Sequence, residues 1–283
     1  MIATAKINIE AIIKKELPPL PSSALRVAAL TQDINCSTRA IADAIGSDPA
    51  LAARILRVAN SPLYALERKV TTLPMAINTL GNDAIHTLIV VSSAADAFAR
   101  TMRKIPMARA LWSHSVAVGL AAREISTALN LRSGEESFLC GLLHDFGKIV
   151  LLHHDIETYQ QTEIAKDERE LLQIETDIYG YNHAQVGALM ARRWGLPEEI
   201  SYTIYNHHQP GEAGQLVFMA RIIDIADELA NSAGITTRPH QEARDVSAAE
   251  SAIALRLQPE QLTTIWERAN EQLDQLTQAL ESL

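Results

Sequence analysis

Cysteine is scarce in this chain of 283 residues, which contains only Cys36 and Cys140. Two cysteines so far apart cannot form the disulfide framework of a small secreted protein. Residues 1–20 also lack the apolar core of a signal peptide. These absences predict a protein of a reducing compartment, for which the cytoplasm is the simplest expectation.

Long apolar runs are lacking as well. A membrane-spanning helix needs roughly 20 consecutive apolar residues. The apolar run at residues 88–91 is soon interrupted by Ser92, Ser93 and Asp96. We therefore expect a soluble protein with no membrane partner.

Concentrated positive charge is absent too, and the formal net charge is −9. Residues 1–105 are mildly basic, with a net charge of +4, whereas residues 106–283 carry −13. The basic residues are dispersed singly or in pairs, without the clustering and interleaved aromatic residues of a nucleic-acid surface. This distribution is typical of solvated helix faces, and we expect no nucleic-acid partner.

The alternation of apolar and polar residues that marks a half-buried strand is not sustained anywhere, and helical periodicity dominates. The expected fold is all-α, and the length favours two helical lobes. Helix starts are predicted at Ser37, a capping residue, and at Asp48-Pro49, where a cap precedes a proline suited to the first turn.

The segment 101–106, with two basic residues and a proline, is the expected boundary between the lobes. The predicted parts are an N-terminal helical lobe (1–105), a second helical lobe (106–235) and C-terminal helices (236–283). The helices predicted from residue 82 onward cover 82–100, 107–129, 134–152, 157–178, 183–194, 197–207, 214–232, 247–257 and 259–280.

The most informative residues for function are His144 and Asp145, which lie side by side in a predicted buried helix. A buried charge costs several kcal/mol unless it is paired, hydrogen-bonded or bound to a metal. Imidazole nitrogen and carboxylate oxygen are ligands of Zn, Mn and Fe, and helix bundles build metal sites from inward-pointing side chains. Candidate partners on neighbouring helices are His114, His183, His207, His208 and Asp227.

Each candidate also has a purely structural interpretation. A single histidine such as His114 is commonly a hydrogen-bonded core residue. His207 and His208 would point about 100° apart on a helix, so one of them need not face an ion. Asp227 and its neighbour Asp224 can serve as outer partners or caps, and Lys148 is by default a solvated lysine. We assign the other histidines to the surface: His86, His153, His154 and His240.

Taken together, the order His, His-Asp and a distant Asp resembles the HD phosphohydrolase superfamily. The segments 17–21 (LPPLP), 47–51 (SDPAL), 57–64 (RVANSPLY) and 76–81 (AINTLG) are similar to the HDOD domain, the HD-related output domain of bacterial signalling proteins. The similarity continues through 112–115 (WSHS), 141–148 (GLLHDFGK), 183–188 (HAQVGA) and 194–197 (WGLP). It covers residues 17 to about 230.

The resemblance implies that the second lobe is an HD-domain-like bundle with a divalent metal, either Fe, Mn, Zn or Mg. The implied ligands are His114, His144, Asp145, His183, His207, His208 and Asp227. Asp145 and Lys148 would be the catalytic residues of an enzyme, since Lys148 matches a lysine that can hold a phosphate oxygen in the related HD-GYP phosphodiesterases.

The chain departs from the HD-GYP enzymes at two places. Ala110 stands where they carry a glutamate, and Gln209-Pro210-Gly211 replaces their Gly-Tyr-Pro segment. Cyclic di-GMP hydrolysis is therefore not expected. Two hypotheses follow from the resemblance. The first is a signalling module that keeps its metal site and acts by binding a signalling protein or a small phosphorylated ligand. The second is a metal-dependent phosphohydrolase that acts on a phosphoester or nucleotide.

Overall fold

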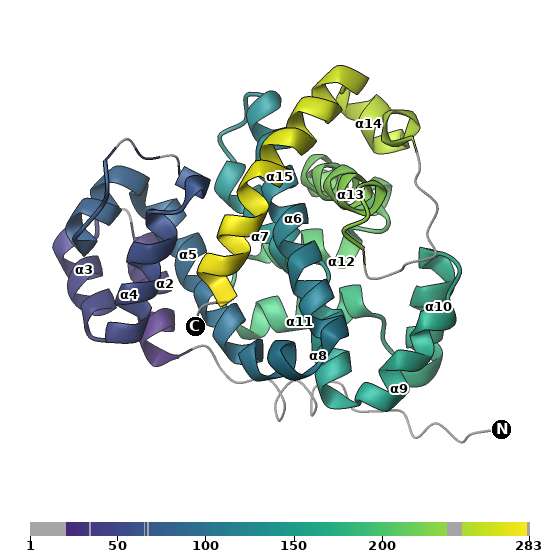
Figure 1. Ribbon diagram of the computed structural model, residues 1–283, viewed down its shortest axis with the longest axis horizontal. Helices are drawn as coiled ribbons and strands as arrows, with labels where there is room; N and C mark the ends of the chain where they lie inside the picture. The colour runs from purple at the N-terminus through teal and green to yellow at the C-terminus, as the bar shows by residue number, and fades with distance from the viewer. Residues whose placement is uncertain (1–20, 34, 65, 67, 237–244, 282–283) are drawn as a thin grey trace. The chain divides into compact units, whose positions relative to one another are not determined.

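The computed structural model describes residues 21–33, 35–64, 66, 68–236 and 245–281. Every regular element among them is an α-helix or a 3-10 helix, which confirms the all-α prediction (Figure 1). His240 and residues 17–20 of the first motif lie outside the described residues. None of the described helices is long and apolar enough to cross a membrane.

The chain divides into two compact units, which are described separately. The larger unit contains residues 101–269 and the smaller unit contains residues 21–100 together with 270–281. The C-terminal helix α15 (Pro259–Glu281) contributes to both units. The predicted division of the chain into 1–105, 106–235 and 236–283 stays a prediction.

The smaller unit is built from α2 (Ser22–Gln32), α3 (Thr38–Gly46), α4 (Pro49–Ala59), η1 (Pro62–Tyr64) and most of α5 (Leu73–Lys104). Both predicted caps are confirmed: the Ser37 side chain accepts a hydrogen bond from the Ala40 backbone nitrogen, and Asp48 accepts from two backbone nitrogens at the start of α4. The helix predicted for 82–100 is confirmed at its start, because Gly81, at φ +83° and ψ 170°, interrupts the helical geometry of α5 with a kink, and the second part of α5 runs from residue 82 to Lys104. The first part of α5, from Leu73 to the kink, was not predicted.

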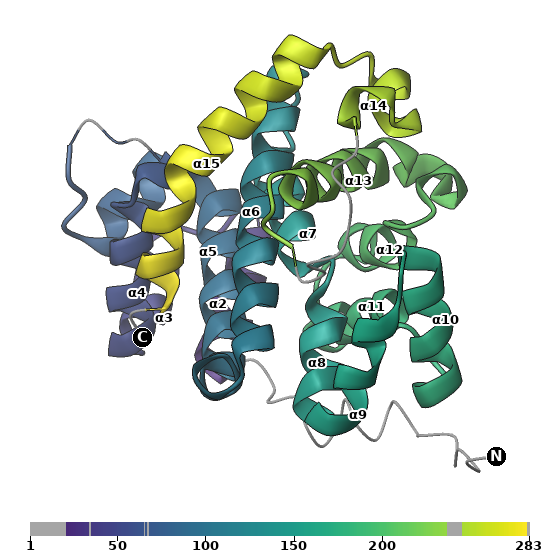
Figure 2. The same cartoon turned by 45° about the vertical axis from the view of Figure 1, so that its right-hand side comes forward.

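The larger unit contains the remaining elements, which are shown from two sides in Figures 1 and 2. In chain order they are α6 (Pro106–Ala128), α7 (Gly134–Leu143), α8 (Phe146–His154), α9 (Ile156–Gln160), η2 (Gln161–Ile164), α10 (Glu168–Tyr179), α11 (His183–Arg193), α12 (Glu198–Asn206), η3 (Pro210–Glu212), η4 (Gly214–Leu216), α13 (Val217–Ser232), η5 (Val246–Ala248), α14 (Glu250–Leu255) and the first part of α15.

Two predicted helices are each interrupted in the structure. The helix predicted for 134–152 breaks between α7 and α8, where Asp145 has the non-helical angles φ −97° and ψ 7°. On one continuous helix, His144 and Asp145 would point about 100° apart, whereas the break lets both face the same centre. The helix predicted for 157–178 is divided into α9, η2 and α10, and Asp167 caps the start of α10.

Close helix packing holds these elements in place. A Cβ atom on Gly141 of α7 would lie 2.9 Å from the Gly119 backbone of α6, so the two helices cross with almost no space between them. At the following break, the fully buried ring of Phe146 meets the rings of Trp112 and Trp194 edge-on, with centroid separations of 6.4 and 5.7 Å. The turn that carries His144 and Asp145 is therefore fixed on both sides.

Candidate metal centre

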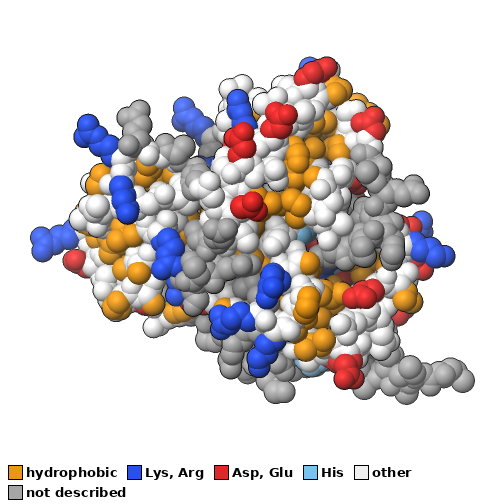
Figure 3. All heavy atoms as spheres, in the orientation of Figure 1, with side chains coloured by type: hydrophobic (Ala, Val, Ile, Leu, Met, Phe, Trp, Pro, Cys, Tyr) orange, Lys and Arg blue, Asp and Glu red, His pale blue; other side chains and the backbone are white. Residues whose placement is uncertain are grey.

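The structure brings all the predicted ligands together inside the larger unit. His114 comes from α6, His144 and Asp145 from the break between α7 and α8, and His183 from the first residue of α11. His207 and His208 follow the end of α12, and Asp227 comes from α13. Their side chains are largely buried: His208 is 12% exposed and Asp227 is 19% exposed, and each of the others is at most 3% exposed. Only small areas of histidine are visible on the face in Figure 3.

Four of the histidines are oriented by an acceptor at Nδ1. His114 lies 2.7 Å from the Ile235 carbonyl oxygen, His144 lies 2.7 Å from that of Gly141, and His207 lies 2.6 Å from that of Ile204. The Nδ1 of His183 lies 2.7 Å from a carboxylate oxygen of Glu175. Because carbonyl and carboxylate oxygens only accept, Nδ1 carries the proton, and the Nε2 of each neutral ring presents a lone pair.

The first group of lone pairs is formed by His114, His144 and Asp227. The Nε2 of His114 is 2.9 Å from Asp227 Oδ1, and the Nε2 of His144 is 3.8 Å from the same oxygen. Asp145 Oδ2 also borders this group, at 3.5 Å from His144 Nε2 and 3.8 Å from His114 Nε2.

The second group is formed by Asp145, His183, His207 and His208. The Nε2 of His183 lies 2.7 Å from that of His208 and 3.2 Å from Asp145 Oδ1. The Nε2 of His207 is 3.7 Å from Asp145 Oδ1. Asp145 thus presents one oxygen to each group, which is the arrangement of a bridging carboxylate.

These groups fit metal ions. Ligand atoms bound at about 2.1 Å to one ion lie roughly 3.0 to 3.4 Å apart in octahedral or tetrahedral geometry, and the separations above, from 2.7 to 3.8 Å, span this range. A shared proton could satisfy one close pair of these acceptors without a metal. It would not satisfy all of them, because His144 Nε2, His207 Nε2 and Asp145 Oδ1 are buried with no hydrogen-bond partner. Buried acceptors of this kind are costly unless a cation or a donor faces them.

The pKa shifts of several candidate ligands favour the deprotonated form that binds a cation. Burial would raise the pKa of Asp145, but the Lys148 ammonium and the neighbouring histidines hold it well below its usual range. Burial lowers the pKa of His207 and, far more, that of His208. His183 is different: burial lowers its pKa, but the Glu175 carboxylate outweighs this and raises it to about 9, so a cation must displace a proton there. Burial also lowers the pKa of His114, but the Asp227 carboxylate outweighs it and raises that pKa above its ordinary value.

The donor types also bear on which metal fits. Five imidazole nitrogens and two carboxylates suit Fe, Mn or Zn, whereas Mg prefers oxygen ligands and retained water. Lys148, the remaining predicted site residue, is buried beside the centre. Its Nζ donates a hydrogen bond of 2.7 Å to Asp145 Oδ2 and lies 3.8 Å from Glu168 Oε1.

Two acidic residues at the centre were not predicted from the sequence. Glu175 orients His183 by accepting bonds from its backbone nitrogen and ring, and also accepts from the Tyr159 hydroxyl. Its place at four-residue spacing between the buried Leu171 and Tyr179 was a usable signal, because it puts a carboxylate in an apolar stripe. Glu168 approaches His208, with Oε1 3.2 Å from Nε2. It follows Asp167 in a polar segment, where the sequence offers no such signal.

Other candidates lie away from the two groups. Asp224 of α13 accepts a hydrogen bond from Ser251 and belongs to the contact with α14. His153 is exposed, as expected, and its Nδ1 is 2.7 Å from the Thr101 hydroxyl. His154 and His86 are half-buried, and His86 belongs to the smaller unit.

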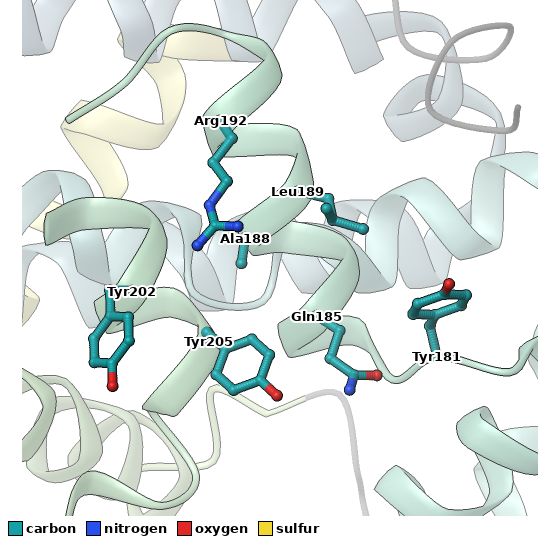
Figure 4. Close-up of a pocket in the computed structure, with 7 residues that line it drawn as sticks. All are labelled: Tyr181, Gln185, Ala188, Leu189, Arg192, Tyr202 and Tyr205. Atoms are coloured by element: carbon teal, nitrogen blue, oxygen red, sulfur yellow. The ribbon is translucent and has the colours of Figure 1, made fainter. Parts of the chain in front are cut away.

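A separate cavity of about 260 Å³ lies over α11 and α12. Figure 4 shows residues spaced along one face of α11 opposite two tyrosines of α12. The lining residues are Tyr181, Gln185, Ala188, Leu189, Arg192, Tyr202 and Tyr205. None of them belongs to the two candidate ligand groups, so this cavity is distinct from the candidate metal centre.

The sequence profile of the HDOD domain matches residues 17–210 of this chain. The chain belongs to the HDOD domain family. An uncharacterized protein of Treponema pallidum is 25% identical over 196 residues, which are 68% of this chain and 38% of that protein. The chain thus spans well under half the length of this curated relative.

Solved structures share the fold. An HDOD domain protein from Geobacter sulfurreducens has a TM-score of 0.73 and 23% identity, covering 97% of this chain and 98% of its own. A candidate phosphohydrolase from Shewanella amazonensis has a TM-score of 0.72 and 21% identity, covering 99% and 100%. A candidate signal transduction protein from Marinobacter aquaeolei has a TM-score of 0.68 and 23% identity, covering 100% of this chain and 68% of its own. At these identities the likeness shows the fold alone.

Proposed function

We propose that this protein is a bacterial signal-transduction module of the HDOD family that binds two divalent cations. The module acts by binding a signalling protein or a small phosphorylated ligand. The observation that carries the metal site is the convergence of five imidazoles and two carboxylates, whose buried acceptors face one another. The signalling role rests on membership of the HDOD family and on a structural neighbour described as a candidate signal transduction protein.

His114, His144 and Asp227 would hold one ion, and His183, His207 and His208 would hold the other, with Asp145 shared between them. Each bound ion would neutralise the carboxylates and link helices that are far apart in the sequence. The chain's own residues prepare the site. Lys148 holds Asp145 in its bridging position, and Glu175 fixes the orientation of His183.

Metal analysis tests this proposal directly. The purified protein is stripped with a chelator, reconstituted with Mn²⁺, Fe²⁺ or Zn²⁺, and freed of excess ion before elemental analysis. We expect about two ions per chain, about one in His207→Ala and a markedly reduced content in Asp145→Ala. His153→Ala is the matched control, because it removes an exposed histidine away from the centre, and it should retain two ions. A wild-type protein that keeps no ion would refute the metal site.

A metal-dependent phosphohydrolase is the second candidate function. It is favoured by the position of Lys148, whose ammonium lies beside the shared Asp145 where a phosphate oxygen could also be held. The metal-loaded protein is screened against a panel of phosphoesters and nucleotides. Turnover that is lost in Asp145→Ala and kept in His153→Ala would establish the enzyme and overturn the non-catalytic role. An inactive, fully loaded protein supports the signalling module.

A further inference from the structure

Glu168 occupies the solvent side of the second ligand group. Among the side chains there, Asp145, His183 and His207 are at most 3% exposed, while His208 is 12% and Glu168 is 24% exposed. A molecule approaching this group from solvent therefore meets His208 and Glu168 first.

The position of its carboxylate is that of a further ligand. Glu168 Oε1 lies 3.2 Å from His208 Nε2 and 3.9 Å from His183 Nε2, the two nitrogens that are themselves 2.7 Å apart. The shorter of these separations equals that between Asp145 Oδ1 and His183 Nε2, which is also 3.2 Å. Glu168 Oε1 also lies 3.8 Å from the Lys148 ammonium, so it stands close to the cationic group of the site.

Hydrogen bonds at the start of α10 fix the backbone on both sides of Glu168 and so keep its carboxylate beside His208. Asp167 accepts a hydrogen bond from the Glu170 backbone nitrogen, and the Glu170 carboxylate accepts from the Lys166 backbone nitrogen. Two helical turns further on, Glu175 holds His183. Because residues seven apart lie on the same helix face to within about 20°, α10 presents both carboxylates to the ligand group from one side.

From this geometry we infer that Glu168 is a closing ligand of the ion held by Asp145, His183, His207 and His208. The inference rests on the proposed two-ion site. Structural metal sites have all positions filled by protein, whereas catalytic sites keep one open for water or substrate. With Glu168 in place, a phosphate has to displace a carboxylate to reach this ion and Lys148. The group is therefore closed to anions, and movement of the start of α10 would open it.

Cobalt substitution tests this inference without relying on turnover. The visible spectrum of the Co²⁺-loaded protein is recorded while inorganic phosphate is added, and Co²⁺ affinity is measured by competition with a chelator. We expect the wild-type spectrum to remain unchanged at millimolar phosphate. In Glu168→Ala the spectrum should shift with phosphate, and the affinity of one of the two ions should fall by about 10- to 100-fold.

Glu163→Ala is the matched control. It removes the same charge from an exposed position in the neighbouring η2 and should behave as the wild type. If Glu168→Ala loses helical content, Glu168→Gln, which keeps the side-chain size, replaces it in the measurements of phosphate response and Co²⁺ affinity. Variants at Glu168 that keep wild-type affinity and stay insensitive to phosphate would overturn the closing role while leaving the two-ion site intact. A wild-type protein that binds no Co²⁺ would instead refute the site itself.

Discussion

Replacing Gly147 by alanine tests how the candidate metal centre is held together. Gly147 lies in α8 just after Asp145, and its Cα faces the first turn of α11. A Cβ atom at this position would overlap the carbonyl oxygen of His183 and lie 2.8 Å from its carbonyl carbon and 2.9 Å from the Gly187 nitrogen. All these atoms belong to the backbone, so no side chain can rotate away.

The sign of the change in stability separates two effects of the substitution, the higher helix propensity of alanine and the steric clash of its Cβ with α11. In a helix without a close neighbour, alanine is favoured over glycine by about 1 kcal/mol. Overpacking usually costs about 1–3 kcal/mol, and a rigid backbone neighbour puts Gly147→Ala at or beyond the upper end. We expect a loss of about 3 kcal/mol or more in the unfolding free energy of the larger unit, which lowers its Tm by roughly 6–12 °C.

Thermal unfolding of the chelator-treated protein measures this loss, and metal analysis of the same samples measures its effect on the centre. Moving α8 away from α11 separates Asp145 from His183, so metal content should fall as well. Gly134→Ala is the control, because its Cβ would meet only the Arg123 side chain at an ordinary 3.6 Å. A Gly147→Ala protein as stable as the wild type, or more stable, would show that α8 and α11 are not in backbone contact.

Two further predictions follow from buried groups. Glu175→Gln removes the charge that orients His183 and should weaken cation binding about 10- to 100-fold in calorimetry; an unchanged affinity would mean that the carboxylate does not support the ligand. Burial raises the pKa of the Cys140 thiol to about 12, so at pH 8 a thiol reagent should titrate only the half-buried Cys36 in the native protein and both cysteines after unfolding. Two reactive thiols in the native state would contradict the packing of α7.

The fold class and most helices were predictable because their signals are local. The caps at Ser37 and Asp48, and the Asn182–Gln185 capping box at the start of α11, bind backbone groups within three residues. The break at Asp145 and the division of the 157–178 segment were missed. Helical periodicity continues across both places, and at Asp145 the turn is set by packing of Phe146 against Trp112 and Trp194.

At the candidate metal centre, the sequence indicated which side chains come together but not how each of them is oriented. The order of histidines and aspartates indicated which side chains to bring together. It could not show that Ile235, Gly141 and Ile204 supply the carbonyls that fix the rings, because carbonyls carry no sequence signature. Those contacts decide which nitrogen carries the proton, and hence which nitrogen is available to an ion.

The break at Asp145 links the sequence motif to the proposed metal site. A continuous helix would bury His144 and Asp145 on different faces, and one carboxylate could not border both ligand groups. The chain turns at Asp145 because Phe146 is held between Trp112 and Trp194, and Gly147 lets α11 approach. The residues that follow the His-Asp pair therefore place its carboxylate between two sets of imidazoles, and the same turn sets Lys148 against it. Whether that site is open or closed is then decided by Glu168, outside the motif.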